Sequence, residues 1–494
     1  MNATPAQHGT ATASWVDSPR RFIAPLALAQ FICSFAGSNM NVMINDISRD
    51  LHTDVKGVQT TITLFLLIMA VLMIPCSKLT DRWGRKRCFI GGLILYGIGT
   101  VLSAVAPGLG VLILGNSVFQ GVGTAFLIPP VYILTTLAFT SLESRAKAFG
   151  VISGLGGIGA AAGPLIGGLI TSGISWRAAF VFQALVVGTI ILLSRRVVDP
   201  LPPDSTRPFD VVGAILSAVG MFCLVFGILQ ADSNVTLFIV FFAIGVVFLV
   251  GFFLFVRSRE RAGKDALLST DLFKNRTSNL GLITQNLQWL LLMGVSFVVS
   301  VFLQTERHYS AIKTGVIFTA ATVGVLVSSL AAERLAKRRL QKTLISAGFA
   351  VTAAGVGLLL GLVHAASSSA WAFSPGLLLI GLGLGVMLTP SVNLVQSAFP
   401  EDEQGEISGL SRSVSNLGSS FGTAIAGTIL VSNLVSGNGT YVAAMIVLAV
   451  VAIAGLVIAR LLPANPLPTA GADVTAGADV EPPLPAPGTL GATS

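Results

Sequence analysis

Apolar stretches long enough to cross a membrane recur along the whole chain. A helix needs about 20 apolar residues to span the hydrocarbon core of a bilayer. Only 11% of the residues are charged, against about 25% in soluble domains. The chain is therefore expected to be an all-α integral membrane protein whose main partner is the lipid bilayer. The fourteen runs of this length cover residues 22–45, 57–77, 88–107, 110–137, 147–172, 177–196, 210–230, 236–257, 279–303, 313–332, 343–364, 373–398, 405–433 and 439–462.

The basic residues gather on one side of this array of spans. If successive loops alternate between the two sides, twenty-five of the thirty lysines and arginines fall on one side. Cytoplasmic loops are enriched in Lys and Arg, so we expect a multi-pass protein of the cell (plasma or inner) membrane with both termini in the cytoplasm. The net charge of +8 then reflects topology, and no nucleic-acid partner is expected.

Several function classes lack the residues that they need. The four cysteines form no CxxC pair and the four histidines are scattered, so we expect no metal site and no cofactor. The sequence contains no GxSxG, P-loop or HExxH motif, and no nucleophile with its base or cluster of carboxylates is evident. We therefore expect no catalytic residues and no enzyme activity. Residues 1–19 do not resemble a signal peptide, so the first span is expected to remain in the protein.

Two groups of six spans echo each other. GVISGL at 150–155 matches GEISGL at 405–410 in five of six positions, and spaced small residues follow both. Two related halves around a central site are typical of alternating-access transporters, although chance similarity between glycine-rich helices is an alternative. The expected parts are a cytoplasmic segment (1–21), an N-terminal six-helix bundle (22–197), a linker with two additional spans (198–277), a C-terminal six-helix bundle (278–462) and a disordered cytoplasmic tail (463–494).

The loop SKLTDRWGRKR at 77–87 places one acid among several cations between the second and third spans. A carboxylate in such surroundings can hold one conformation through ion pairs, and Gly84 permits a tight turn. A plain basic loop is the alternative. The pattern resembles the signature of the major facilitator superfamily, with Ser77 in place of the first glycine. The resemblance implies a conformational switch formed by Asp81, Arg82, Gly84, Arg85 and Lys86.

A glycine motif in the fifth span extends the resemblance. Its four-residue spacing puts the glycines on nearly one face of the helix, where they allow close packing. It is similar to the antiporter motif of that superfamily, which seals and hinges the two halves; generic helix packing is the alternative. Together with FDVVGAIL at 209–216, it makes the chain resemble the fourteen-span drug/proton antiporter branch. That branch has two six-helix bundles and two extra central helices. The motif residues are Gly159, Gly163, Pro164, Gly167 and Gly168.

The chain departs from the family where a buried ion pair is expected. Ala36 stands at the position of the family's acid in the first span, and Ser117 at that of its arginine in the fourth. Joint loss of both charges avoids leaving one of them unpaired in lipid. Asp46, near the outer end of the first span, remains as a possible proton-coupling acid. A solvated carboxylate at a helix end is its simpler interpretation, so proton coupling stays open.

Amides and hydroxyls recur where these charges are missing. Five polar residues follow one face of the first span, and others lie in the fourth and later spans. Polar groups are costly in lipid, so such stripes face a neighbouring helix or a cavity. Hydrogen bonds between helices are the alternative to a cavity that takes a neutral or weakly charged substrate. The expected cavity residues are Ser34, Ser38, Asn41, Asn45, Asn116, Gln120, Gln183, Gln285, Asn286 and Asn393, with Gln30 on the same stripe.

These observations predict a monomeric secondary transporter with a small-molecule substrate. The resemblance implies efflux of small amphipathic or neutral compounds by alternating access, as in multidrug resistance. A proton-independent facilitator or a lipid translocator of the same fold is the alternative, because the family's buried acid and base are replaced by Ala36 and Ser117.

Overall fold

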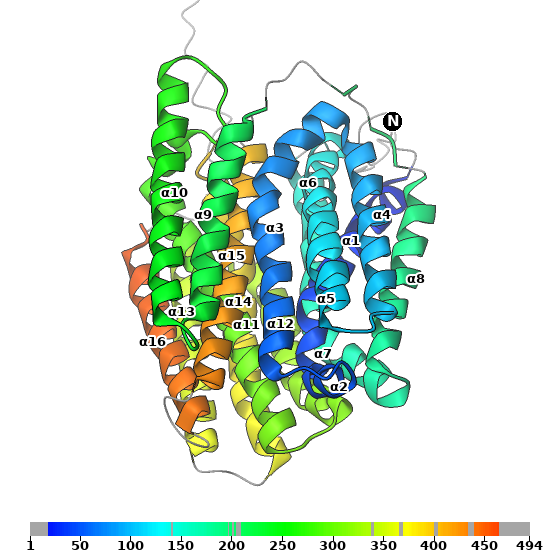
Figure 1. Cartoon of the computed structure of the whole chain (residues 1–494). Helices are drawn as coiled ribbons and strands as arrows, with labels where there is room; N and C mark the ends of the chain where they lie inside the picture. The colour runs from blue at the N-terminus through cyan, green and yellow to red at the C-terminus, as the bar shows by residue number, and fades with distance from the viewer. Residues whose placement is uncertain are drawn as a thin grey trace, which may run out of the picture.

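The chain folds into a bundle of membrane-length helices (Figure 1). A computed structural model describes residues 18–139, 142–195, 197–199, 202–203, 209–336, 340–364, 369–399, 404–432 and 439–463. No β-strand occurs within these ranges. Most of the expected N-terminal segment and all but the first residue of the expected tail lie outside them.

The first half of the bundle runs from α1 to α8, and the second from α11 to α16, with α9 and α10 between them in the sequence. The earlier elements are α1 (Pro19–Asn39), η1 (Met40–Val42), α2 (Ile44–Asp50), α3 (Val55–Trp83), α4 (Arg85–Ala104), α5 (Leu109–Leu112), η2 (Ile113–Gln120), α6 (Gly121–Ala138), α7 (Leu142–Gly173) and α8 (Trp176–Ser194). The later ones are α9 (Val211–Gln230), α10 (Val235–Arg261), η3 (Thr270–Phe273), α11 (Arg276–Val301), η4 (Phe302–Glu306), α12 (Ala311–Ala336), α13 (Gln341–His364), η5 (Ala370–Ala372), α14 (Phe373–Gln396), α15 (Gln404–Val431) and α16 (Gly439–Leu461).

Thirteen helices in the described ranges are long and apolar enough to cross a membrane. A fourteenth is obtained when the two segments of α7, Lys147–Ala160 and Ala162–Gly173, are taken as one span bent by 44°. Pro164 lies four residues beyond Ala160 and has no N–H to donate to its carbonyl, which accounts for a bend at this place. All fourteen predicted spans correspond to these helices.

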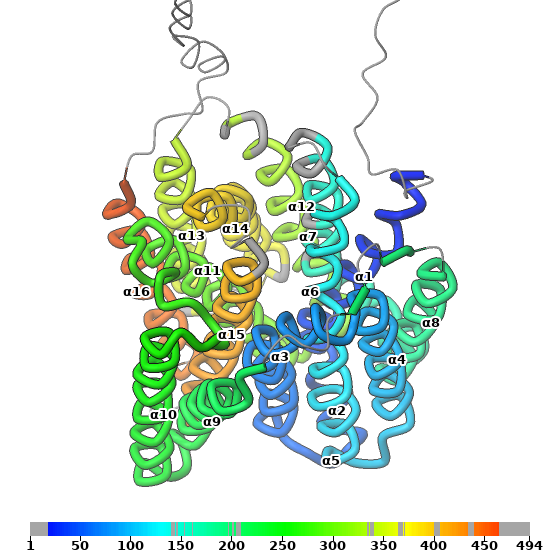
Figure 2. The backbone as a smooth tube through the Cα atoms, turned by 90° about the horizontal axis from the view of Figure 1, so that it is seen from above, coloured from blue at the N-terminus to red at the C-terminus, as the bar shows by residue number. Residues whose placement is uncertain are grey.

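The helices α9 and α10 form a pair at the edge of the bundle (Figure 2). Within α10, only 11% of the spanning window is buried inside the protein. The α9 helix packs on α10 and also touches α3 and α15, one helix from each half. The pair therefore lies beside the junction of the two halves, and most of α10 faces the lipid.

Small residues bring the helix backbones within each half into contact. A Cβ atom on Gly381 of α14 would lie 2.2 Å from the backbone oxygen of Ala321 in α12. In the first half, a Cβ on Gly92 of α4 would lie 2.7 Å from the backbone oxygen of Gly123 in α6. Because lipid supplies no hydrophobic force between helices, such close packing is a main source of their association.

The turn between α3 and α4 depends on glycine for a different reason. Gly84 has a φ of +96°, a backbone conformation that side chains with a Cβ rarely adopt. A Cβ there would also approach Cγ of Pro203 to 3.3 Å. The predicted tight turn at Gly84 is thus present, and it reverses the chain between two spans with a single residue.

We expect Gly84→Ala to lower the free energy of unfolding by about 1–3 kcal/mol, because alanine at this φ is strained. Thermal unfolding of the purified protein in detergent would measure the loss. Gly91→Ala is the matched control, since a Cβ on Gly91 of α4 meets nothing within 4 Å. Equal melting temperatures for the two variants would contradict the assignment.

Candidate functional site

A small cavity lies between the two halves of the bundle. Helices α1, α3, α6 and α7 line it from the first half, and α11 and α15 from the second. Its volume is about 60 Å³, whereas drug-sized ligands need roughly 300–1,000 Å³. In this conformation the cavity is too small for a ligand of that size. The lining residues are Gln30, Cys33, Ser34, Gly37, Phe65, Leu66, Met69, Met73, Ile128, Ala160, Trp289, Met293, Arg412, Ser415, Asn416 and Ser419.

Among the described residues that line the cavity there is one cation, Arg412, which sequence reasoning did not place there. The predicted span 405–433 contains Arg412, and in α15 it lies eight residues beyond the first residue of the helix. Its Nη2 donates a hydrogen bond to the hydroxyl of Tyr132 in α6, and its guanidinium lies 4.8 Å from the centre of that ring. Arg412 and Tyr132 therefore join the two halves beside the cavity. An arginine two turns inside an apolar run was the signal that could have revealed it.

Most of the remaining lining is apolar and adaptable. Phe65 and Trp289 contribute aromatic rings from opposite halves, and three methionines lie among them. Methionine side chains are flexible and polarisable, so they adjust to ligands of different shape. Such walls suit a range of organic molecules rather than one rigid ligand.

The predicted polar stripe on the first span is divided between two environments. Gln30 and Ser34 line the cavity, where Gln30 donates to Ser34 Oγ over 3.3 Å. Asn41 and Asn45 lie farther along, beyond the end of α1, in η1 and α2. The α-helix does not continue through all five positions, so they do not share one face.

Asn41 and Asn45 belong to a seam between the halves at one end of the bundle, which we name the far seam. Asn45 Nδ2 donates to the backbone oxygen of Gln304 over 2.6 Å, and Gln304 Nε2 donates to that of Asn41 over 2.7 Å. Ser300 Oγ also donates to Asn41 O, and the backbone N–H of Ile312 donates to Ser172 Oγ over 2.9 Å. The far seam thus uses neutral hydrogen bonds. Sequence reasoning missed its second-half members, because pairing across 259 residues leaves no local pattern.

The other predicted cavity residues occupy several places. Three of them have partners elsewhere: Gln183 accepts from Tyr96 Oη over 2.8 Å, Gln285 accepts from Ser411 Oγ over 2.7 Å, and Asn286 donates to the backbone oxygen of Val414 over 2.9 Å. Asn393 is exposed. None of these four lines the cavity described above, so the structure does not bring the predicted set together.

Asn116 and Gln120 lie in η2, a π-helical segment within the fourth span. Neither the nitrogen nor the oxygen of the buried Asn116 amide has a hydrogen-bond partner among the described residues. Gln120 is within 3.5 Å of Ser103 Oγ. Ser117, at the position of the family's arginine, donates to the backbone oxygen of Thr61 over 2.7 Å. The hydroxyl at 117 therefore joins η2 to α3 without a charge.

The glycine motif of α7 brings this helix against two partners. A Cβ on Gly159 would lie 2.3 Å from the backbone oxygen of Phe31, and one on Gly163 would lie 2.0 Å from Ser38 Oγ. Gly167 also faces α1, with Asn39 Cβ at 3.1 Å from its added Cβ. On the neighbouring position, a Cβ on Gly168 would lie 2.5 Å from the backbone oxygen of Ala311, at the start of α12. Pro164 also meets the other half, since a Cβ on Gly315 of α12 would lie 2.4 Å from its backbone oxygen. The motif therefore joins α7 both to its own half and to α12 of the other half.

The predicted switch loop lies at the opposite end of the bundle, which we name the basic end. Arg85 Nη2 pairs with Asp81 Oδ1 at 2.6 Å. Asp199 Oδ2 accepts from the backbone N–H of Arg85 over 2.8 Å and of Lys86 over 3.3 Å. A carboxylate at a helix N-terminus is stabilised by the helix dipole, so Asp199 holds the start of α4. These contacts all lie within the first half.

Another pair at the basic end connects the halves. Lys78 of α3 pairs with Glu406 of α15, and both side chains are about one-third exposed, at 33% and 29%. Glu406 also accepts from the backbone N–H of Ser269, over 3.1 Å. The segment 265–272 thereby crosses this end of the bundle, and Leu267 is bound through its N–H to the buried Asp210, over 3.2 Å.

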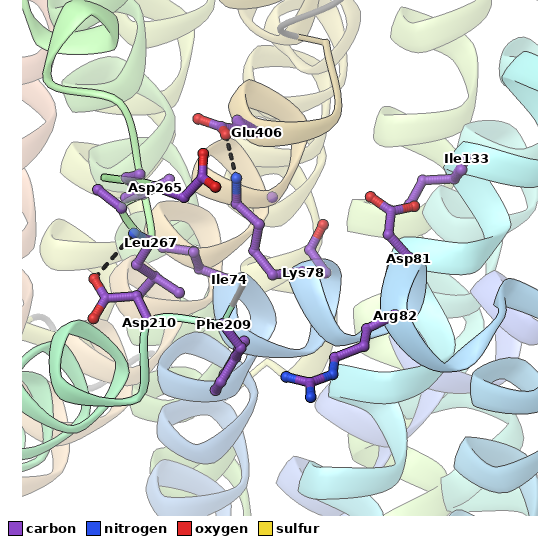
Figure 3. Close-up of a pocket in the computed structure, with 14 residues that line it drawn as sticks. Ile74, Lys78, Asp81, Arg82, Ile133, Phe209, Asp210, Asp265, Leu267 and Glu406 are labelled. Carbon is purple, nitrogen blue, oxygen red and sulfur yellow. Dashed lines mark hydrogen bonds and ion pairs between the residues drawn. The ribbon is translucent and has the colours of Figure 1, made fainter. Parts of the chain in front are cut away.

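This segment covers a pocket of about 390 Å³ between the two halves (Figure 3). Lys78 points toward Glu406 on one side, while Asp81 and Arg82 lie on the other. The pocket contains side chains of both charge signs, including Asp210 and Asp265. It is larger than the central cavity and more polar.

Asp46, the possible coupling acid, lies in α2 and is half-buried. Burial raises the pKa of its carboxyl above the ordinary value, although the charge of Arg49 acts in the opposite direction. It does not line the central cavity. Any coupling through Asp46 would act at the end of the bundle that holds the far seam.

Comparisons with known proteins match most of the chain. The model of the Major Facilitator Superfamily matches residues 26–423, with a further match over 281–487. The puromycin resistance protein pur8 of Streptomyces alboniger is 30% identical over 83% of this chain and 82% of that protein. The multidrug efflux pump LfrA of Mycolicibacterium smegmatis is 27% identical over 87% of this chain and 83% of the pump. The probable actinorhodin transporter of Streptomyces coelicolor is 28% identical, over 80% of this chain and 69% of that protein.

We expect Gly159→Ala to destabilise the protein by about 1–3 kcal/mol, because the added Cβ would overlap the backbone of α1. Gly157→Ala on the same helix is the control, since a Cβ there meets nothing within 4 Å. Melting temperatures of the two purified variants check this difference. A Gly159→Ala protein as stable as the control would show that α1 and α7 do not cross as closely as described.

Proposed function

The chain belongs to the Major Facilitator Superfamily, and we propose on this premise that it exports small amphipathic organic compounds by alternating access. Membership makes it a secondary transporter rather than an enzyme. The resistance and efflux proteins among its relatives support export. So does the adaptable apolar lining of the cavity.

One observation carries the mechanism: the cavity lies between halves that touch at both ends. The far seam consists of neutral hydrogen bonds, and the basic end has the Lys78–Glu406 pair. An ion pair that water reaches contributes about 0–1 kcal/mol, so this pair adds little to the cost of opening the basic end. Transport then requires the two ends to open in turn, which moves the substrate without a continuous channel.

The proposed orientation follows from the charges. The basic end faces the cytoplasm, because loops rich in Lys and Arg stay on that side. Both termini are then cytoplasmic, and the membrane is the cell membrane. In this arrangement the 390 Å³ pocket is the cytoplasmic approach, and the far seam closes the external side. The two six-helix bundles at 22–197 and 278–462 are the moving halves, and 198–277 connects them in a monomer.

We expect a disulfide across the basic end to stop transport reversibly. A Cβ on Gly409 would lie 3.6 Å from Ser77 Cβ, within the range of a disulfide. In a background with the four native cysteines replaced by alanine, Ser77→Cys with Gly409→Cys should lose export on oxidation and recover it on reduction. The measurement is the efflux of a fluorescent dye from cells that lack their own pumps.

The two single-cysteine variants are the controls and should transport under both conditions. Full export by the oxidised, cross-linked double variant would rule out opening at this end. Alternating access at the basic end would then be wrong.

Coupling to protons is a separate question, and Asp46 is the acid to test. Its raised pKa means that it keeps its proton to a higher pH than a free carboxyl. If it carries the coupled proton, Asp46→Asn, which is neutral at every pH, should abolish export driven by a proton gradient. Asp50→Asn is the control, because a hydrogen bond from Arg177 lowers the pKa of Asp50, and it should remain coupled.

A protonophore distinguishes the alternatives in the same assay. Wild-type export that stops with the protonophore supports proton coupling, and its persistence in Asp46→Asn would place the proton elsewhere. Equilibration that ignores the protonophore would favour the proton-independent facilitator. Movement of a labelled phospholipid between leaflets, without dye export, would favour the lipid translocator.

A further inference from the structure

Resting on the proposed transport function, we propose that Arg412 makes the central cavity a binding site for the anionic group of an aromatic, amphipathic substrate. The transport function names no charge class for the substrate. Arg412 supplies a positive charge, and it is the one cation among the described side chains that line the cavity.

The position of Arg412 separates it from the basic loops. Eight residues lie between it and the start of α15, which is about 12 Å along a helix. Arg412 therefore lies about two turns inside the helix rather than in a loop. A cation at such depth is costly unless an anion or a strong set of acceptors compensates for it.

The described residues compensate the positive charge of Arg412 only in part. A guanidinium carries five N–H donors, and the partner found for it is the hydroxyl of Tyr132. That hydroxyl donates in turn to Gln30 Oε1 over 3.4 Å. The ring of Tyr132 adds a cation–π contact. All of these groups are neutral, and they leave N–H donors of the guanidinium free for a ligand.

No aspartate or glutamate stands among the described residues that line the cavity. Within the described ranges, no carboxylate lies within 4.0 Å of the Arg412 guanidinium. Lys78, Arg85 and Arg177 differ from Arg412 in this respect, since each of them pairs with an acid. The cavity thus has a positive charge without its counterion, which is the condition for attracting an anion.

The surrounding side chains define the rest of the ligand. Phe65 and Trp289 contribute aromatic rings to the lining, and Met69, Met73 and Met293 contribute flexible side chains. Aromatic rings stack on such surfaces, and methionines adapt to their outline. Arginine binds a carboxylate through two parallel hydrogen bonds. The site therefore fits an aromatic body that carries a carboxylate or a similar acidic group.

Binding of two matched probes to the purified full-length protein tests this assignment. The probes are 1-pyrenebutyrate and its neutral amide, 1-pyrenebutyramide, which differ in charge but share the aromatic body. We expect the wild type to bind the carboxylate at least about tenfold more tightly than the amide. Arg412→Gln should remove this preference, and Arg412→Lys should keep part of it.

Arg460→Gln is the matched control, because Arg460 is exposed at the end of α16, and it should keep the full preference. Equal binding of the two probes by the wild type would overturn the proposal. So would an Arg412→Gln variant that stays folded on heating and weakens both probes alike, because Arg412 would then only hold the halves together. Displacement of the carboxylate by phosphatidylglycerol but not by benzoate would assign Arg412 to a lipid headgroup and also overturn it.

An export assay separates this proposal from the transport function. Export of neutral dyes without any carboxylate preference would leave the transport function intact and refute the role of Arg412. A carboxylate preference in a protein that exports neither probe nor dye would support the binding site and count against transport.

Discussion

Contact between helix backbones at glycine is the interaction on which the rest of this structure depends. Inside a bilayer, apolar side chains gain little by leaving lipid for protein, so helices associate through close packing. In α7, Gly159 and Gly163 meet α1, while Gly168 meets the start of α12 in the other half. One helix thus fixes the inside of its own half and also its distance to the second. This contact therefore helps to set how the two halves meet at the cavity, the far seam and the basic end.

The two ends of the junction use different chemistry. At the far seam, Asn41, Asn45 and Gln304 exchange hydrogen bonds without any charge. At the basic end, Lys78 and Glu406 form an ion pair that water reaches. A water-exposed pair loses little when it separates, because solvent replaces each partner. Buried amides lose more, since an unpaired polar group in an apolar setting is costly. Separating the hydrogen bonds of the far seam therefore costs more free energy than separating the Lys78–Glu406 pair.

Charge has two distinct functions in this chain. At the basic end, cations such as Lys78 and Arg85 form ion pairs with acids. Arg412 lies within a span, beside Tyr132 and the central cavity. Counting cations by side could not separate the two groups, because that count does not use the depth of a residue within its predicted span, and Arg412 lies inside the span 405–433. Its partner comes from α6, about 280 residues away, and only folding shows which side of α15 faces it.

The sequence by itself determined the helices, their number and their order. In lipid every backbone N–H and C=O must be satisfied within its own segment, so a long apolar run can form little else than a helix. Gly84 and the bend before Pro164 were readable for a similar reason, since both follow from the backbone chemistry of single residues. The tertiary structure alone decided which polar side chains meet. It sent Gln30 and Ser34 to the cavity and Asn45 to the far seam, because α1 ends at Asn39 and the chain turns before α2. Polar pairs between distant helices depend on crossing angle and depth, and neither quantity is encoded in the spacing of residues along one helix.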